Sequence, residues 1–277
     1  MVIAAHPRDV RFLGVSAVVF AASAAVTILW CASMSAMGAM PMPGGWTMSM
    51  VWMPGPGQTW FGASASFVAM WTVMMMGMML PSLVPILWRY RQAITATSEV
   101  RLDWLTTLVG AGYFFVWTVL GMAAFPAGVA LAGAAMQRPA LARVVPTVPG
   151  LIFLLAGAFQ FTAFKTHQLA CCRAVPAPGR AGPPNAIEAW RDGLRLGVHC
   201  SYCCAGLTAV LLVVGVMDLR AMAAVALAIT TERLALNGRR RARFIGAVLV
   251  GAGLWMTASA LHKTVVVDNP AADHSQQ

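Results

Sequence analysis

The chain has 277 residues, of which 59% are hydrophobic and only 10% are charged, and its mean hydropathy is +0.72. Soluble domains carry about 25% charged residues, so this composition excludes an ordinary soluble protein and predicts helices that cross a membrane. The net charge of +10 could point to nucleic acid. The placement of the cationic residues around the apolar stretches explains this charge better, and we expect no nucleic-acid partner.

Seven apolar stretches reach or approach the length of about 20 residues that a helix needs to cross a lipid bilayer. They are residues 12–30, 61–88, 104–134, 144–164, 194–217, 221–236 and 244–261. None shows the alternation of a barrel strand. Pro126 predicts a kink in the overlong third stretch, whereas Glu232 and Arg233 make the sixth the weakest. The sequence therefore predicts an all-α, polytopic membrane protein with about seven transmembrane helices, forming a single domain over residues 1–277.

Lysine and arginine predict the orientation of these helices. With the N-terminus in the cytoplasm, most of the 19 cationic residues fall on the cytoplasmic side. The exceptions are Arg138, Arg143, Arg220 and Lys263. We therefore expect the inner membrane of a bacterium, with the N-terminus inside and the C-terminus outside, where residues 263–277 form a flexible tail. Residues 12–30 also resemble a signal peptide, but they exceed its usual apolar length of about 7–15 residues, which favours a retained helix.

Methionine is concentrated in two segments. The uncharged outer loop, residues 31–60, holds Met34, Met37, Met40, Met42, Met48, Met50 and Met53. The second stretch holds Met70, Met74 and Met78 on one helical face, with Met75 and Met79 beside them. Thioethers bind Cu(I) without deprotonation, but methionine also fills gaps between packed helices. We interpret the loop as a metal-collecting segment. For the helix, packing is the stronger interpretation, although Met70, Met74 and Met78 are candidate ligands.

The segment His199-Cys200-Ser201-Tyr202-Cys203-Cys204 concentrates the strongest metal ligands of the chain. On a helix, Cys200 and Cys204 share one face, and His199 and Cys203 share a neighbouring one. Thiolate and imidazole together suit Cu(I) and Zn(II) and suit hard cations poorly. The segment therefore predicts a metal site, with a packed cluster of buried thiols as the main alternative.

A second group of ligands follows the fourth stretch, in the predicted cytoplasmic loop 165–193. It contains His167, Cys171 and Cys172. The cytosol keeps thiols reduced, so metal binding is favoured over disulfides. Adjacent helical residues point apart, and we expect only one of Cys171 and Cys172 to join the site. Cys31 lies on the outer side and is assigned no role.

Two ionisable residues lie at the same predicted depth as the cysteines. Lys165 and Glu232 occupy the ends of apolar stretches, where a charge is costly and marks a functional candidate. Lys165 could offset the negative charge of thiolates, whereas Glu232 could simply pair with Lys165 or Arg233.

Three stretches resemble a bacterial family described as predicted metal-binding integral membrane proteins. They are residues 71–82, with Met-Met-Leu-Pro-Ser at their end; residues 160–176, with Cys171-Cys172-Arg173; and residues 191–217, with Cys200-Ser-Tyr-Cys203-Cys204. The resemblance covers roughly residues 67–232 and implies a helical membrane fold and metal binding, but no reaction. The family spaces its first cysteine pair as Cys-Leu-x-x-Cys-Arg. Here Cys172 fills the second place and Gln168 stands near the first, so this half of a shared site has fewer cysteine ligands.

The preferred function is Cu(I) handling, with Zn(II) as the second candidate ion. The outer methionines would collect the ion and the inner cysteines would hold it, for uptake or for delivery to a copper chaperone or a metalloenzyme. The alternatives are a membrane thiol oxidoreductase that uses Cys200 and Cys203, and an assembly subunit without chemistry. No phosphate-binding loop, catalytic triad or paired carboxylates stand out, and we expect no enzyme.

Overall fold

The computed structural model describes residues 7–36, 40–41, 47–48, 52, 57–94, 98–137, 147–173, 185–235 and 237–268. The helices in these residues are α1 (Pro7–Ala36), α2 (Trp60–Ala93), α3 (Glu99–Gln137), α5 (Val148–Gln160), α6 (Ala163–Arg173), α7 (Ala186–Val214), α8 (Leu219–Leu234) and α9 (Gly238–Asp268). Two short strands, β1 (Met40–Pro41) and β2 (Thr47–Met48), pair antiparallel. Most of the predicted outer loop 31–60 and residues 269–277 of the predicted tail lie outside the described residues.

Side-chain caps fix where several helices begin. The oxygens of Thr59, Asn185 and Asp218 accept hydrogen bonds from backbone N–H groups in the first turns of α2, α7 and α8. Helix α7 is followed by Gly215, whose φ of 131° is readily adopted only by glycine. This turn redirects the chain from α7 into α8.

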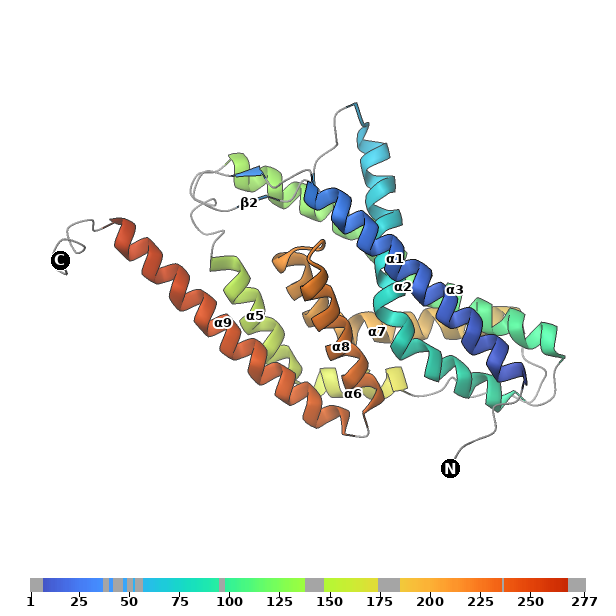
Figure 1. The fold of residues 1–277 in the computed structure, drawn as a ribbon. Coiled ribbons are helices and arrows are strands. Elements are labelled where there is room, and N and C mark those ends of the chain that lie inside the picture. Colours follow the sequence, from blue (N-terminus) through green and yellow to red (C-terminus); the bar gives the residue numbers. More distant parts are fainter. Residues whose placement is uncertain are drawn as a thin grey trace.

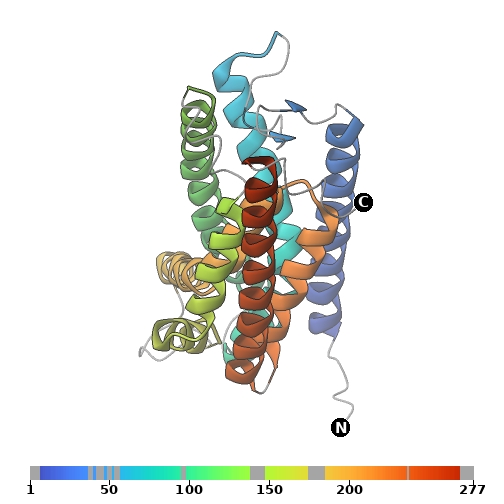
Figure 2. The same ribbon diagram turned by 90° about the vertical axis from the view of Figure 1, so that its left-hand side faces the viewer.

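Helix α2 forms the centre of the bundle, with α1, α3 and α8 packed around it (Figure 1). Helix α7 packs along α3, and α5 packs along α9 (Figure 2). Glycines bring the second pair close together: a Cβ on Gly157 would lie 2.9 Å from the Gly246 carbonyl oxygen. Many large apolar side chains of α1, α3 and α9 are exposed, as expected of helices that face lipid.

The described residues confirm the all-helical prediction but not seven spans. Five helices are long and apolar enough to cross a membrane: α1, α2, α3, α7 and α9. A sixth span exists if α5 and α6, bent by 68°, count as one. Helix α8 has only 16 residues, and Glu232 and Arg233 are buried in its last turn. The predicted span 221–236 is therefore too short to cross alone.

The bend between α5 and α6 divides the predicted span 144–164. The N–H groups of Phe161 and Thr162 bond to carbonyls three residues back, which tightens the last turn of α5. The Thr162 hydroxyl then accepts a hydrogen bond from the Lys165 N–H and begins α6. More than half of the predicted loop 165–193 is consequently helical, because α6 continues to Arg173 and α7 starts at Ala186.

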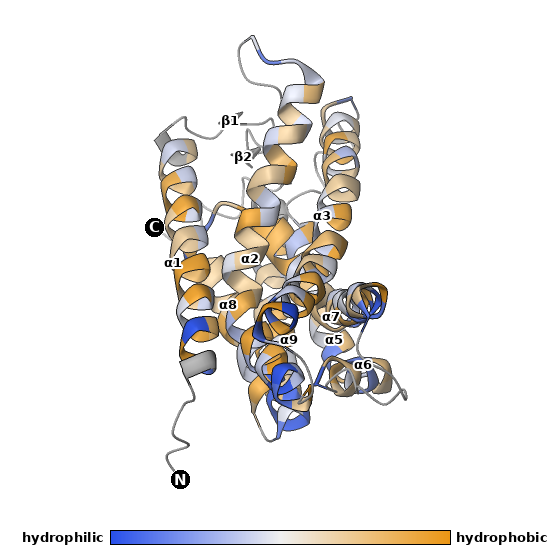
Figure 3. Ribbon diagram, turned by 90° about the vertical axis from the view of Figure 1, so that its right-hand side faces the viewer, coloured by the Kyte–Doolittle hydropathy of each residue, from blue (hydrophilic) through white to orange (hydrophobic). Residues whose placement is uncertain are grey.

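Polar segments gather at one end of the bundle, where α1 and α9 begin and α6 lies (Figure 3). The sequence places Arg11 early in α1 and Arg239, Arg240 and Arg241 in the first turn of α9. This grouping agrees with the assignment of these arginines to one side of a membrane. The direction in which that side faces stays a prediction.

Candidate metal centre

Four cysteine sulfurs meet in the interior, at the junction of α6 and α7. Cys200, Cys203 and Cys204 of α7 form a group whose sulfurs all lie within 4.8 Å of one another. The Cys172 Sγ of α6 lies 3.4 Å from the Cys203 Sγ. Each of the four residues is at most 1% exposed. We call these four residues the cysteine cluster.

Helical periodicity and the α5–α6 bend together build this cluster. Residues three and four apart lie on one face of a helix, which is why the cysteines of α7 point inward together. The Sγ atoms of Cys200 and Cys204 are 3.8 Å apart, and those of Cys203 and Cys204 are 3.6 Å apart. Cys172 reaches them only because the bend turns α6 back against α7.

Two polar side chains from two other helices contact Cys200, and a third, Ser82, bonds to one of them. The Tyr113 hydroxyl of α3 donates to the Cys200 Sγ at 2.9 Å, and the Arg233 Nη1 of α8 lies 3.4 Å from the same sulfur. Arg233 Nη1 also donates to the Ser82 hydroxyl of α2 at 2.8 Å and to the Tyr113 hydroxyl at 3.2 Å. A guanidinium this close stabilises negative charge on the sulfur, and so favours the thiolate that binds metal.

Close contact between α3 and α7 places Tyr113. A Cβ on Gly197 would lie 2.9 Å from the Tyr113 carbonyl oxygen, and one on Gly112 would lie 2.7 Å from the Trp190 carbonyl oxygen. Both approaches require a residue without a side chain. They bring the Tyr113 ring within reach of Cys200, one turn along α7.

A buried ion pair lies on the other side of the cluster. Lys165 Nζ and Glu232 Oε2 are 2.8 Å apart, and both side chains are at most 2% exposed. The Lys165 ammonium also donates to the Cys203 carbonyl oxygen, which links the pair to the cysteine helix. Glu232 thus pairs with Lys165, one of the two partners expected from the sequence, while Arg233 faces Cys200.

The remaining predicted ligands lie elsewhere. His199 is half-buried, with its Nδ1 2.7 Å from the Gln168 Oε1. His167 is exposed, and its Nδ1 is 4.0 Å from the Sγ of the half-exposed Cys171. Of the two adjacent cysteines, Cys172 points inward and Cys171 does not. Met70, Met74 and Met78 are buried in the apolar core of α2.

Sequence reasoning missed Tyr113 and gave Arg233 no role at the sulfurs. The signal for Tyr113 was its hydroxyl in the middle of an apolar stretch, since a buried tyrosine usually finds a hydrogen-bond partner. Ser82 stood within the Met-Met-Leu-Pro-Ser stretch. Its contact with an arginine of α8, 151 positions away, is a product of the fold.

The sulfur spacing suits a single soft ion. Metal–thiolate bonds are about 2.3 Å long, so two sulfurs on a trigonal ion lie about 4.0 Å apart, and closer on a tetrahedral one. The contacts of 3.6 and 3.8 Å are close to the tetrahedral spacing, and the contact of 3.4 Å between Cys172 and Cys203 is shorter. None of the six cysteines forms a disulfide. No carboxylate or imidazole belongs to the group, and an all-sulfur donor set is selective for soft ions such as Cu(I), with Zn(II) also accommodated.

A family model described as PpoB2, copper chaperone, matches residues 68–256, which is more than half of the chain and includes the whole cysteine cluster. The chain therefore belongs to this family. No curated protein and no solved structure gives a significant match.

Proposed function

We propose that this member of the PpoB2 copper chaperone family binds Cu(I) at its cysteine cluster and delivers the ion to a copper-requiring acceptor. The observation that carries the proposal is the meeting of four buried sulfurs, from two helices, at spacings that suit one metal ion. The family description gives the cargo as copper, and the sulfur ligands fit the Cu(I) state.

The charges around the cluster support a bound, monovalent ion. Cu(I) held by two or three thiolates carries a net negative charge, which is costly to bury without a neighbouring cation. Arg233 supplies that cation at Cys200, and the Lys165–Glu232 pair is neutral overall. Each coordinating thiol gives up one proton as the ion binds, so tight binding requires this stabilisation of the thiolates.

Cys172 is the ligand best placed to release the ion. It lies near the end of an 11-residue helix that follows the bend at Phe161, whereas the other three cysteines are held within the 29-residue α7. We propose that movement of α6 withdraws Cys172 and opens a coordination position. A thiolate of the acceptor then enters that position, and ligand exchange passes Cu(I) on without any change in its oxidation state.

We further propose that the domain lies in the inner membrane of a bacterium, with the cysteine cluster near the cytoplasmic side. The five long apolar helices and their exposed apolar side chains support insertion in a lipid bilayer. The polar starts of α1 and α9 lie at one end of the bundle, and the arginines in their sequence support the orientation with the N-terminus inside.

The two alternative functions find less support in the contacts. A thiol oxidoreductase needs a thiolate that its partner can reach, and Cys200 and Cys203 are at most 1% exposed. An assembly subunit without chemistry has no need of a buried guanidinium against thiols, because polar groups are costly to bury without a function.

The decisive experiment measures copper and zinc in protein purified anaerobically in detergent from cells grown with both metals. The wild-type chain is compared with a Cys200/Cys203/Cys204→Ser variant and with Cys171→Ser, which removes a thiol that points away from the cluster. We expect equal copper in the wild type and in Cys171→Ser, and clearly less copper in the triple variant. Equal copper in all three proteins would contradict the proposal. Zinc in place of copper would identify Zn(II) as the ion that the protein binds.

A further inference from the structure

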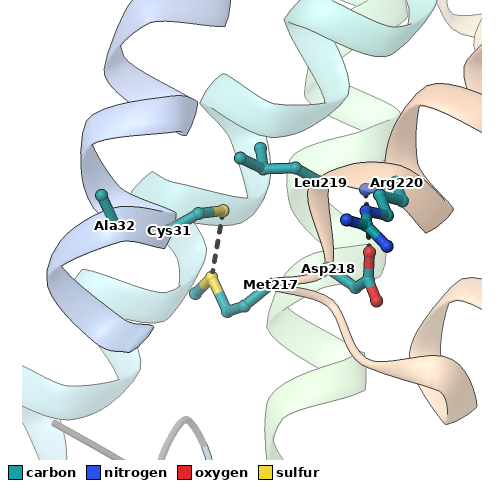
Figure 4. A pocket seen from close by; sticks show the side chains of 6 residues that line it. All are labelled: Cys31, Ala32, Met217, Asp218, Leu219 and Arg220. Carbon is teal, nitrogen blue, oxygen red and sulfur yellow. Dashed lines mark hydrogen bonds between the residues drawn. The ribbon is translucent and has the colours of Figure 1, made fainter. Parts of the chain in front are cut away.

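A second pair of sulfurs lies under an open pocket between α1 and the turn that joins α7 to α8. The Cys31 Sγ and the Met217 Sδ are 3.7 Å apart and point toward one another (Figure 4). The pocket has a volume of about 380 Å³ and is lined by Cys31, Ala32, Met217, Asp218, Leu219 and Arg220. Cys31 is 2% exposed, whereas Asp218 and Arg220 are exposed.

This pocket lies at the start of α8, whereas Arg233, which contacts the cysteine cluster, lies at its end. Asp218 directly precedes α8 and Arg233 ends it, and a helix rises about 1.5 Å per residue, so the two ends are about 22 Å apart. A path along α1 and α2 gives a similar separation between the pocket and the cysteine cluster. Gly77 of α2 contacts Ser23 of α1. Cys31 lies about 12 Å beyond that contact on α1, and Ser82 about 7 Å beyond it in the other direction on α2. The pocket is therefore no extension of the cluster.

The chemistry of the pocket suits a monovalent soft cation. Two sulfurs on one ion with bonds of about 2.3 Å lie at most about 4.6 Å apart, and the observed 3.7 Å allows a bent arrangement with room for another ligand. Asp218 also lines the pocket, and its carboxylate is turned toward the start of α8, away from the two sulfurs (Figure 4). Its Oδ1 accepts from the N–H groups of Arg220 and Ala221, so it is held in place by the start of α8.

The plain alternative is an S–H···S contact that only packs α1 against the turn. Packing alone gives no account of the open pocket beside the two sulfurs, whereas the Asp218 carboxylate is explained as the cap of α8. The pair also combines the two side chains that bind Cu(I) best, one from each side of the pocket.

We propose that Cys31 and Met217 form a second Cu(I) site, a receiving site that loads the cysteine cluster. This rests on the proposed function, because it assumes that the cluster also binds Cu(I). On binding, the Cys31 thiol gives its proton to water in the pocket, and copper stays Cu(I). One thiolate and one neutral thioether bind the ion less tightly than several thiolates do. The difference in affinity therefore favours movement of Cu(I) from the pocket to the cluster.

The test counts Cu(I) bound by purified, reduced protein, using competition with a chromophoric Cu(I) chelator. The wild-type chain should bind about two ions per chain, and Cys31→Ser, with the cluster intact, about one. A Cys200/Cys203/Cys204→Ser variant should retain about one ion, and adding Cys31→Ser should remove it. In that triple background Met217→Leu should weaken binding by about tenfold or more. Met222→Leu, a buried methionine of α8 that does not line the pocket, is the matched control.

These variants separate the two proposals. If Cys31→Ser lost an ion and the triple variant did not, the result would support the receiving site and contradict Cu(I) binding by the cysteine cluster. If Cys31→Ser left Cu(I) binding unchanged, both in the wild-type chain and in the triple variant, the receiving site would be contradicted. The proposal for the cysteine cluster would not be affected. Equal effects of Met217→Leu and Met222→Leu on Cu(I) affinity would also contradict the receiving site, because they would show that the Met217 thioether is not a ligand.

Discussion

The methionine face of α2 and the cysteine cluster are both rich in sulfur and both buried, but their surroundings differ. Met70, Met74 and Met78 lie in an apolar core with aromatic rings and aliphatic side chains. The cysteine cluster instead meets Tyr113 and Arg233. Charged groups are costly to bury, so they persist in the interior chiefly where they balance another charge. The two regions therefore differ in what surrounds their sulfurs: apolar side chains in one, and a hydroxyl and a buried guanidinium in the other.

The methionine face is explained by packing. Trp71, on the same helix, donates its ring N–H to the Trp117 carbonyl at 2.9 Å, and its ring covers Gly121 so closely that a Cβ there would collide with it. Flexible methionine side chains fill the irregular space around such a tightly placed ring. The contacts therefore favour a structural role for these methionines over the relay that the sequence allowed.

The largest effect is expected at the ion pair beside the cluster. Lys165→Met leaves the Glu232 carboxylate buried without its cation, and the free energy of unfolding should fall by about 3–5 kcal/mol. Lys165→Met combined with Glu232→Leu should recover most of that loss, because neither charge is then left alone. Thermal unfolding in detergent measures both changes. A double variant no more stable than the single one would show that the pair itself stabilises the fold.

Arg233 sharpens the comparison most directly. Arg233→Met keeps an apolar stem of similar length but removes the positive charge at Cys200, and Cu(I) affinity should fall by about 100-fold. Arg240→Gln, which removes an exposed arginine of α9, should leave the affinity unchanged. Chelator competition gives both values. If the two variants behaved alike, the buried cation would have no part in metal binding.

The two adjacent cysteines of α6 provide a matched pair. Cys172→Ser removes a sulfur 3.4 Å from the Cys203 Sγ, and Cu(I) affinity should fall by about tenfold or more. Cys171→Ser makes the same change on the other side of the helix and should have little effect. The rate of Cu(I) transfer to a thiol acceptor, measured by stopped flow, should change for Cys172→Ser and not for Cys171→Ser. Normal transfer by that variant would exclude Cys172 as the releasing ligand.

The smallest effect is expected on the methionine face. Leucine has nearly the volume of methionine, so each of Met70→Leu, Met74→Leu and Met78→Leu should cost less than about 1.5 kcal/mol of stability. Copper binding by the triple variant should equal that of the wild type. If a variant folded normally but lost copper binding or copper transfer, the structural role would be contradicted and these methionines would again be candidate ligands.

Local patterns were sufficient for part of this protein. Composition determined the all-helical class, because long apolar runs in a chain with few charges must satisfy their backbone groups within helices. Helical periodicity predicted that Cys200 and Cys204 share one face, since residues four apart are neighbours on any helix. It placed Cys203 with His199 on a neighbouring face, whereas the fold buries Cys203 with the other two cysteines and leaves His199 outside the group. Adjacency on a helix also predicted that only one of Cys171 and Cys172 would join them.

Only the tertiary structure decided which partners those cysteines meet. The bend at Phe161 and Thr162 selects Cys172, and it depends on a short polar turn that an average hydropathy does not register. Arg233 is 33 positions from Cys200, and Met217 is 186 from Cys31. A sequence reports periodicity within one helix, because that repeat is set by the backbone. The rotation and approach of different helices are set by packing, so contacts over such separations appear only in the folded chain.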